Sequence, residues 1–449
     1  MLASRNPLMN CEADPLKDEY DWISINLIIC CTLPRSPFRP IYPRMKTLTD
    51  RPAALPSILS AEDVQTAREI ADWLLQVSRA GRDLGQLWDE FCRRLALEGV
   101  PVERGTAILM VLHAIKEGVL CEWRMGQGVE VEPWHHAPGN ARIYQESPLR
   151  LVHETGSWLH RAIDGESAAE FPILADLKAL GYTDYLCVPI IFANGMQNAL
   201  TFASREPQGF SERDIALLQQ IMPTAKIVLE LMSVYRSMDD VLAMYVGREP
   251  GGRILAGEVR RGVVNKMEAA ILVADMRDFT LLSDRLGDKQ TVELLDAYYD
   301  CIIPPILEHG GEVLKFTGDG ILAIFQDGSG IGECQLCRGG ALEAAIEGQA
   351  CLEALDTSQW GSDVEVKAGI ALHHGKVAFG NVGSGERLDF TVIGKDVNLA
   401  ARLGAKCRTL HEPILMSKTF ADCLPVPVRK LGDFSLRGLP GTQDVYIPA

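Results

Sequence analysis

Apolar and polar residues recur with two different periods along the chain, and each period predicts a different element. Apolar residues spaced three or four apart from about residue 61 predict a helix; they are Trp73, Leu74, Val77, Leu84, Leu87, Trp88, Phe91 and Leu95. Short apolar runs at 106–112 and 117–123 then predict strands. The runs at 182–192 and 199–203 flank Asn194-Gly195, a pair typical of a hairpin turn.

A second long helix is predicted to begin after Ser211, a plausible N-cap, and to continue towards Met244 with a kink or break at Pro223. Its apolar positions form a stripe that consists of Ile215, Leu218, Ile221, Ile227, Leu231, Tyr235 and Leu242. The stripe has two interpretations, pairing with a second chain or packing on its own domain. The glycine-rich segment 246–262 is expected to be a hinge.

The C-terminal part of the chain centres on residues 310–325. Apolar runs at 313–316 and 321–325 flank Thr317-Gly318-Asp319-Gly320, which predicts a hairpin with Asp319 at its tip. Upstream, an apolar strand ends at Asp275, and a helix is predicted over 281–309 with a possible break near Asp288. A helix over 339–355 and a strand over 364–373 follow.

The first 58 residues have no core pattern, and we expect a disordered extension there. The apolar run 22–33 is about half the length of a membrane span, and its acidic upstream flank is wrong for a secretory signal. Met45 looks like a natural start. A weak membrane-surface or partner-binding segment is the alternative. No transmembrane segment is expected.

Charge and cysteine content narrow the function classes. The 449 residues carry a net charge of −16, which argues against general binding to nucleic acid or acidic membranes. The 12 cysteines are scattered and follow no signal peptide, so we expect reduced thiols and a cytoplasmic location. Cys334 and Cys337 form a lone pair that lacks a second pair at zinc spacing.

Two acidic residues at strand ends are a plausible magnesium site, because Mg²⁺ prefers carboxylate and phosphate oxygens. The segment after Asp275 opens a helix, whose N-terminal N–H groups favour phosphate. Three motifs in this region, ADMRDFT at 274–280, GGEVLKFTGDG at 310–320 and RLDFTVIGKDVNLAARL at 387–403, resemble the catalytic domain of class III nucleotidyl cyclases. The resemblance covers about residue 269 to the C-terminus.

This resemblance implies an α/β (α+β) chain with a C-terminal ferredoxin-like catalytic domain. The order of elements before it resembles a GAF-like α+β sensory domain, which would bind an unknown small molecule or simply dimerise. His113, His135 and His136 in that region are expected at its surface or core edge. The expected domains are a 1–58 extension, a 59–235 GAF-like domain, a 236–265 helical and glycine-rich coupling linker and a 266–449 cyclase domain.

The family's metal ligands correspond to Asp275, Asp319 and the backbone carbonyl of Met276, which would hold two Mg²⁺ (or Mn²⁺) ions per active site. Phe279 and Thr280, where the helix opens, are expected to contact the substrate. Asn398 and Arg402, four residues apart on one helix face, would hold the ribose and the α-phosphoryl oxygens. Arg437 is expected to contact the terminal phosphates. Asp278 departs from the family, which usually has glycine there.

Lys315 and Asp389 are expected to select the base. Lysine only donates and ionised aspartate only accepts, which suits N1 and the 6-amino group of adenine and not guanine. The alternative is a plain ion pair between these two residues that does not contact the substrate.

In the family, the metal aspartates come from one chain and the Asn/Arg pair from the other, so a homodimer with shared sites is implied. The leading hypothesis is an adenylyl cyclase that acts on ATP and is regulated by its N-terminal domain. A guanylyl cyclase and an inactive homologue acting as a ligand sensor are the alternatives. A diguanylate cyclase would need a GGDEF-like turn, and this chain has TGDG.

Overall fold

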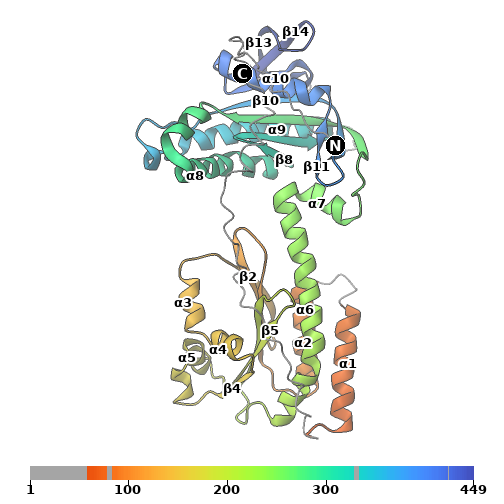
Figure 1. The fold of residues 1–449 in the computed structure, drawn as a ribbon, viewed down its shortest axis with the longest axis vertical. Coiled ribbons are helices and arrows are strands. Elements are labelled where there is room, and N and C mark those ends of the chain that lie inside the picture. The colour runs from red at the N-terminus through yellow and green to blue at the C-terminus, as the bar shows by residue number, and fades with distance from the viewer. Residues whose placement is uncertain (1–57, 78–82, 328–332, 423) are drawn as a thin grey trace, which may run out of the picture. The chain divides into compact units, whose positions relative to one another are not determined.

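The computed structural model describes residues 58–77, 83–327, 333–422 and 424–449, without the side chains of 333–336. The predicted N-terminal extension, its apolar run 22–33 and the side chain of Cys334 lie outside the described residues. The chain carries two β-sheets, one before and one after a long helix, and each is described by itself (Figure 1).

The first sheet has six antiparallel strands in the order β3-β2-β1-β6-β5-β4. The strands are β1 (Arg104–Met110), β2 (Lys116–Arg124), β3 (Gly128–His135), β4 (Leu159–Ala162), β5 (Asp184–Ile191) and β6 (Gln197–Ser204). The predicted strands correspond to β1, β2, β5 and β6. The strands β3 and β4 were missed, because both are short or mostly exposed and show little apolar patterning.

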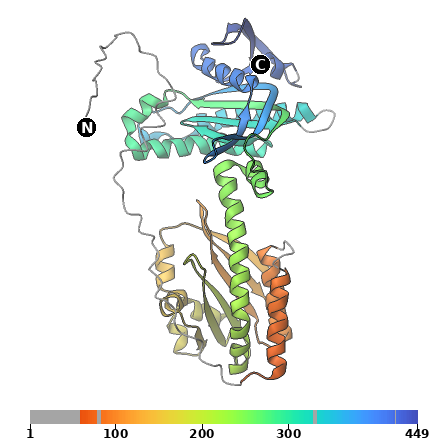
Figure 2. The ribbon, with the colours of Figure 1, turned by 45° about the vertical axis from the view of Figure 1, so that its right-hand side comes forward.

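Helices cover both faces of this sheet (Figures 1 and 2). On one face lie α1 (Ala61–Val77), α2 (Leu84–Leu97) and the first half of α6 (Glu212–Val246), which share a core with the sheet. On the other face lie α4 (Pro148–Thr155) and α5 (Pro172–Ala179), with a core of their own. The short helices α3 (Asn140–Gln145) and η2 (Ser167–Ala169) complete this part.

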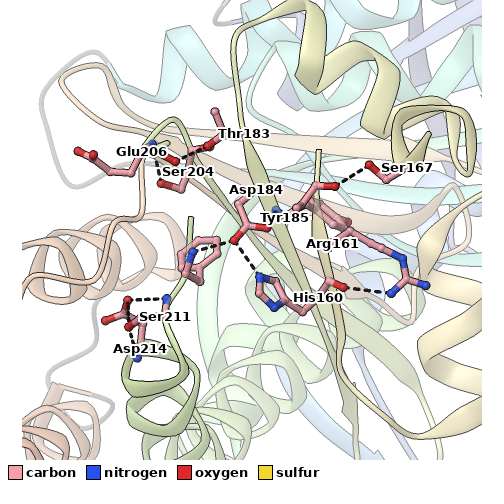
Figure 3. A network of polar contacts seen from close by, with 12 residues as sticks. His160, Arg161, Ser167, Thr183, Asp184, Tyr185, Ser204, Glu206, Ser211 and Asp214 are labelled. Atoms are coloured by element: carbon pink, nitrogen blue, oxygen red, sulfur yellow. Dashed lines mark hydrogen bonds and ion pairs between the residues drawn. The ribbon is translucent and has the colours of Figure 1, made fainter. Parts of the chain in front are cut away.

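A polar network fixes the start of α6 to the sheet (Figure 3). Buried Asp184 on β5 accepts hydrogen bonds from the backbone N–H of Phe210 at 2.7 Å and from its own neighbour Tyr185, and it contacts His160 Nε2 at 2.8 Å. Ser211 and Asp214 form a capping box, which confirms the predicted N-cap. The first turn of α6 is therefore held by both side-chain and backbone contacts.

The helix α6 runs without interruption through Pro223, so the predicted break there is wrong. Its apolar stripe divides in two: residues such as Leu218 and Ile221 are buried, whereas Ile227, Leu231 and Tyr235 are exposed. By length and composition this helix is able to cross a membrane, yet 44% of its most apolar window is buried inside the protein. The absence of a transmembrane segment stays a prediction.

The glycine-rich segment 246–262 contains a further helix, α7 (Arg248–Leu255), and its role as a hinge stays a prediction. The Glu312 carboxylate accepts a hydrogen bond from the Glu249 backbone N–H at 2.7 Å, and Gln326 donates to the Glu249 side chain at 2.7 Å. Arg253 lies over the ring of Phe379. These tertiary contacts stabilise a helix that the sequence Pro-Gly-Gly alone disfavours.

The second sheet contains the core order β10-β7-β9-β8. Numbered along the chain, this is the order 4-1-3-2 of a βαββαβ unit, which is the predicted ferredoxin-like arrangement. Its elements are β7 (Val264–Met276), α8 (Phe279–Glu308), β8 (Glu312–Thr317), β9 (Gly320–Gln326), α9 (Glu333–Ala354) and β10 (Ala368–Gly383). The predicted hairpin is confirmed, and α8 breaks at Gly287, one residue from the predicted position.

The remaining elements extend this sheet and cover its other face. They are η3 (Ser358–Trp360), β11 (Leu388–Ile393), α10 (Lys395–Leu410), β12 (Ile414–Ser417), α11 (Lys418–Ala421), β13 (Val428–Ser435) and β14 (Thr442–Pro448). Alternate residues of β7 face opposite layers: Leu272 packs with α8 and α9, whereas Ile271 packs on the other face, where α10 also lies.

A disulfide joins Cys301 on α8 to Cys351 on α9. The prediction that the cysteines are reduced is therefore wrong for this pair. Among the described residues, Cys92, Cys121, Cys187 and Cys407 are free thiols.

Candidate active site

The end of β7 and the turn of the β8–β9 hairpin bring the two predicted metal aspartates together. Thr317 pairs with Gly320, which leaves Gly318 and Asp319 as a two-residue loop. Gly318 has φ +67°, a conformation that glycine adopts at low cost. A methyl group at Gly320 would lie 3.6 Å from Asp275 Oδ1, so the carboxylate of Asp275 is adjacent to this turn.

The two carboxylates influence each other directly. Packing around Asp275, and then the charge of Asp319 and a hydrogen bond with it, raise the pKa of Asp275 from 3.8 to about 6, while Arg408 opposes the shift. Asp275 keeps a solvent-accessible side, so the direction of the shift rests mainly on the two like charges. A pair of carboxylates that repel each other in this way is a favourable site for a cation.

Two adjacent tyrosines of α8 lie behind the loop of Gly318 and Asp319, which we call the metal loop. Sequence reasoning missed both. The Tyr299 hydroxyl donates to the carbonyl of Gly318 at 2.6 Å, and its ring packs on Phe316. Tyr298 is fully buried, and its hydroxyl has no hydrogen-bond partner among the described residues. Burial, and then the charges of Asp275 and Asp319, hold the pKa of Tyr298 well above its usual range, which keeps the phenol neutral.

The first residues of α8 follow Asp275 and Met276 directly. Asp278 precedes the helix in the left-handed region, with φ 57°, which explains why a glycine suits this position. Its carboxylate is exposed and lies 3.9 Å from Arg408, so it makes an ion pair with the protein itself. Phe279 is half-buried and Thr280 exposed in the first turn of the helix.

The two predicted base-selecting residues lie on strands that share one core. Lys315 is half-buried on β8, and Asp389 is exposed on β11, which pairs with β10. Their neighbours Leu314 and Phe390 belong to the same apolar cluster. No ion pair joins Lys315 to Asp389 in this described part of the chain, so the alternative of a plain ion pair is not observed.

Asn398 and Arg402 both lie exposed on α10, as predicted. The helix packs along β10 so that Cys407 contacts Gly369, which is the register partner of Asp275. Asn398 precedes Cys407 by nine residues (407 − 398), which is about 13 Å along a helix. The short side chain of Asn398 therefore lies far from the metal aspartates of its own chain.

Arg437 is exposed between β13 and β14. These strands form one edge of the sheet, and β8 forms the other. Within one chain, the structure therefore does not bring Arg437 to the loop of Asp319.

A second polar cluster lies at the opposite end of the strands. Ligand atoms of Glu268, Asp327 and His374 lie within 4.8 Å of one another. Arg338 Nη2 lies 2.9 Å from His374 Nδ1, and because arginine only donates, the proton of the ring stays on Nε2, facing Asp327 at 2.8 Å. A cation could bind this histidine only after that proton leaves.

Comparison with known proteins gives the same fold and function class for this part of the chain. Residues 263–447 match the adenylate and guanylate cyclase catalytic domain. An adenylate cyclase of Anabaena cylindrica is 32% identical over 182 residues, which cover 39% of this chain and 34% of the relative. Adenylate cyclase 1 of Rhizobium meliloti is 27% identical over 208 residues, which cover 45% and 31%. The chain spans about a third of the length of these relatives.

Among solved structures, the adenylyl cyclase CyaB from P. aeruginosa is similar at 26% identity and a TM-score of 0.37, covering 41% of this chain and 94% of that one. The βαββαβ sheet with a carboxylate pair at one end defines a ferredoxin-like domain suited to metal-dependent nucleotide chemistry. With the family match, residues 263–447 are a class III adenylyl/guanylyl cyclase catalytic domain.

Proposed function

We propose that this protein is an adenylyl cyclase that converts ATP to 3′,5′-cyclic AMP and pyrophosphate in a homodimer with shared active sites. The observation that carries the proposal is the adjacent pair Asp275 and Asp319 at the end of β7 and in the β8–β9 turn. Two mutually repelling carboxylates, and a buried Tyr298 hydroxyl without a partner in the described part of the chain, fit divalent cations with their water ligands.

Mg²⁺ or Mn²⁺, two per site, would activate the ribose 3′-hydroxyl and neutralise the triphosphate. The carboxylates of Asp275 and Asp319 and the carbonyl of Met276 would hold these ions. The N–H groups of Phe279 and Thr280 would point to phosphate at the N-terminus of α8. Arg437 of one chain would contact the terminal phosphates.

Asn398 and Arg402 would complete the site from the second chain. Asn398 would orient the ribose, and Arg402 would donate to the charge that develops on the α-phosphoryl oxygens. The support is a distance of about 13 Å along α10. It separates Asn398 from Cys407, the residue that contacts Gly369 beside the strand of Asp275. A short amide side chain cannot cover that separation, so a second copy of the chain would supply it.

The helix α6 offers a contact for the second copy. A line of its apolar residues recurs at alternating spacings of four and three, which is the seam of a two-stranded coiled coil. We call Ile227, Leu231, Val234, Met238, Val241 and Tyr245 the α6 seam; Val241 is half-buried and the other five are exposed. The seam lies between a GAF-like sensory domain, by our proposal, and the catalytic domain. A ligand of the first would regulate the second through this helix and α7.

The direct test is an assay of the purified full chain with ATP and GTP, each with Mg²⁺ and with Mn²⁺. We expect cyclic AMP from ATP and no product when Asp319 is replaced by alanine. Asp422→Ala, which removes an exposed carboxylate paired with Lys418, is the matched control and should keep full activity. A folded Asp319→Ala protein with substantial activity would contradict the proposal.

A further inference from the structure

The cross-link between α8 and α9 lies in an asymmetric environment. Cys301 and Cys351 have Cα atoms 5.3 Å apart and are separated by 50 residues in the sequence. Cys301 is only 3% exposed, whereas Cys351 is open to solvent. A small reagent can therefore reach the sulfur of Cys351 and cannot reach that of Cys301.

The other described cysteines are poor competitors for such a reagent. Burial raises the pKa of Cys121, Cys187 and Cys407 to about 12, and that of Cys92 well above its usual range. Since the thiolate is the reactive form, these four stay as thiols. Cys337 is half-buried, and its sulfur lies 2.5 Å from the carbonyl of Gln326.

The cross-link is close in sequence and in space to the metal loop. Cys301 follows Tyr299 by two residues and Tyr298 by three, so all three belong to one turn of α8. Tyr299 donates its hydroxyl to Gly318, and Tyr298 lies buried within the electrostatic reach of Asp275 and Asp319. A constraint on this turn is therefore also a constraint on the loop of Asp319.

We propose that Cys301 and Cys351 form a reversible thiol–disulfide exchange site for small thiols and small disulfides, whose oxidised form steadies the metal loop through Tyr299. The exchange site stands on its own, and its effect on metal binding rests on the proposed function. Oxidation fixes the turn of α8 against α9. Reduction removes this covalent constraint and leaves packing, the hydrogen bond from Tyr299 to Gly318, and the contacts of His309 with Glu343 and Glu347 on α9.

The chemistry balances with a small thiol as reductant. Its thiolate attacks Cys351 Sγ, a new S–S bond forms there, the Cys301–Cys351 bond breaks, and Cys301 leaves as a thiolate that takes up a proton. A second small thiol then attacks the mixed disulfide, releases the small disulfide and leaves Cys351 as a thiol. In the reverse direction the small disulfide is the oxidant, and two small thiols are released.

The test equilibrates the full chain in defined mixtures of reduced and oxidised glutathione, in the absence of nucleotide. Three readouts follow: alkylation of Cys301 and Cys351 after acid quenching and unfolding, measured by peptide mass spectrometry; the thermal unfolding midpoint; and Mn²⁺ affinity by electron paramagnetic resonance. We expect both cysteines to become protected together as the mixture is oxidised, with a higher midpoint. We expect reduction to weaken Mn²⁺ binding about two- to tenfold, the effect of making one loop-holding hydrogen bond intermittent.

Three variants keep the result interpretable. Cys351→Ser, at an exposed position, should behave like the reduced native chain in every glutathione mixture. Cys337→Ser should respond to the mixtures like the native chain. Tyr299→Phe should keep the exchange and lose its effect on Mn²⁺ affinity. After acid quenching and unfolding, protection of Cys301 and Cys351 in unequal amounts overturns the exchange site, and equal Mn²⁺ affinity of both forms overturns the coupling. Absence of Mn²⁺ binding in both forms would instead contradict the proposed metal site, while alkylation still reports the exchange.

Discussion

The hydroxyl of Tyr299 donates a hydrogen bond of 2.6 Å to the backbone carbonyl of Gly318, the residue immediately before Asp319. This contact ties a helix of the catalytic domain to the turn that presents one of the two candidate metal ligands. The ring of Tyr299 packs on Phe316, 4.7 Å away between centroids, so the same side chain supports the strand and its turn.

We predict that Tyr299→Phe lowers the apparent affinity for Mn²⁺ about two- to tenfold, the equivalent of one net hydrogen bond. The ring and its packing are kept, so the thermal midpoint should change little. Tyr144→Phe, which removes a hydroxyl that contacts His153 in the first sheet's domain, is the control. Equal losses of Mn²⁺ affinity in both variants would show that the effect is not specific to the loop.

Shared active sites predict complementation between two inactive variants. Asp275→Ala and Arg402→Ala should each be nearly inactive, because each damages every site. In an equal mixture with free subunit exchange, half of the dimers combine one chain of each kind and have one intact site, so about a quarter of the native activity should return. Activity should be measured beside a mass-resolved count of mixed dimers; abundant mixed dimers without activity would mean that each site is built within one chain.

The α6 seam predicts which substitution separates the subunits. Leu231→Glu places a charge in the seam, whereas Arg236→Glu places the same side chain on the outward side of the helix at an exposed position. Because a buried leucine contributes about 1.5–3 kcal/mol in each copy, the first variant should weaken dimerisation about a hundredfold or more. Analytical ultracentrifugation over a range of concentrations measures this. A Leu231→Glu protein that dimerises as strongly as the native chain would show that the dimer contact lies elsewhere.

The raised pKa of Asp275 predicts the pH dependence of stability in the absence of metal. Its pKa is about 6 in the folded chain and 3.8 as the ordinary value, so between these pH values the folded state holds the proton more tightly. As the pH rises through this window the unfolded chain loses the proton first, and the folded state becomes less stable. Asp275→Asn removes this loss of stability.

The thermal midpoint of Asp275→Asn should therefore exceed that of the native chain by an amount that grows from about pH 4 to about pH 6 and is then constant. Asp278→Asn, which removes an exposed carboxylate beside Arg408, is the control for loss of a single charge in this region. Mn²⁺ affinity of the native chain should rise over the same range, since the cation requires the ionised carboxylate. A constant difference in midpoint across the window would refute this assignment.

The base preference rests on Lys315 and Asp389. ATP should be preferred over GTP by about a hundredfold or more, because guanine would leave both side chains facing groups of the wrong kind, at about 1–3 kcal/mol each. Exchanging Lys315 for glutamate and Asp389 for cysteine should collapse the activity on ATP and raise GTP turnover only weakly. A native protein that cyclises GTP as fast as ATP would contradict the assignment of base selection to these two residues.

Local patterns predicted much of the catalytic fold. The hairpin around Asp319 and the helix that carries Asn398 and Arg402 are defined by residues within one element, so periodicity and turn residues suffice. The contacts Tyr299–Gly318 and Cys301–Cys351 join residues far apart in the sequence, and no local signal encodes which partner each one meets. The helix α7 was missed for a related reason: Glu312, more than fifty residues away, accepts a hydrogen bond from its first turn and overrides the breaking tendency of Gly251 and Gly252.

The α6 seam has a consequence for how the length of this helix can vary. Each inserted residue rotates the helix beyond it by about 100°. A single insertion between Ile227 and Tyr245 would therefore turn the seam residues after it away from the face that holds those before it. Seven inserted residues restore the line almost completely, since two helical turns nearly close on themselves. Insertions and deletions in this helix should therefore be tolerated in multiples of seven residues. The same rule should hold for chimeric proteins that are joined within it.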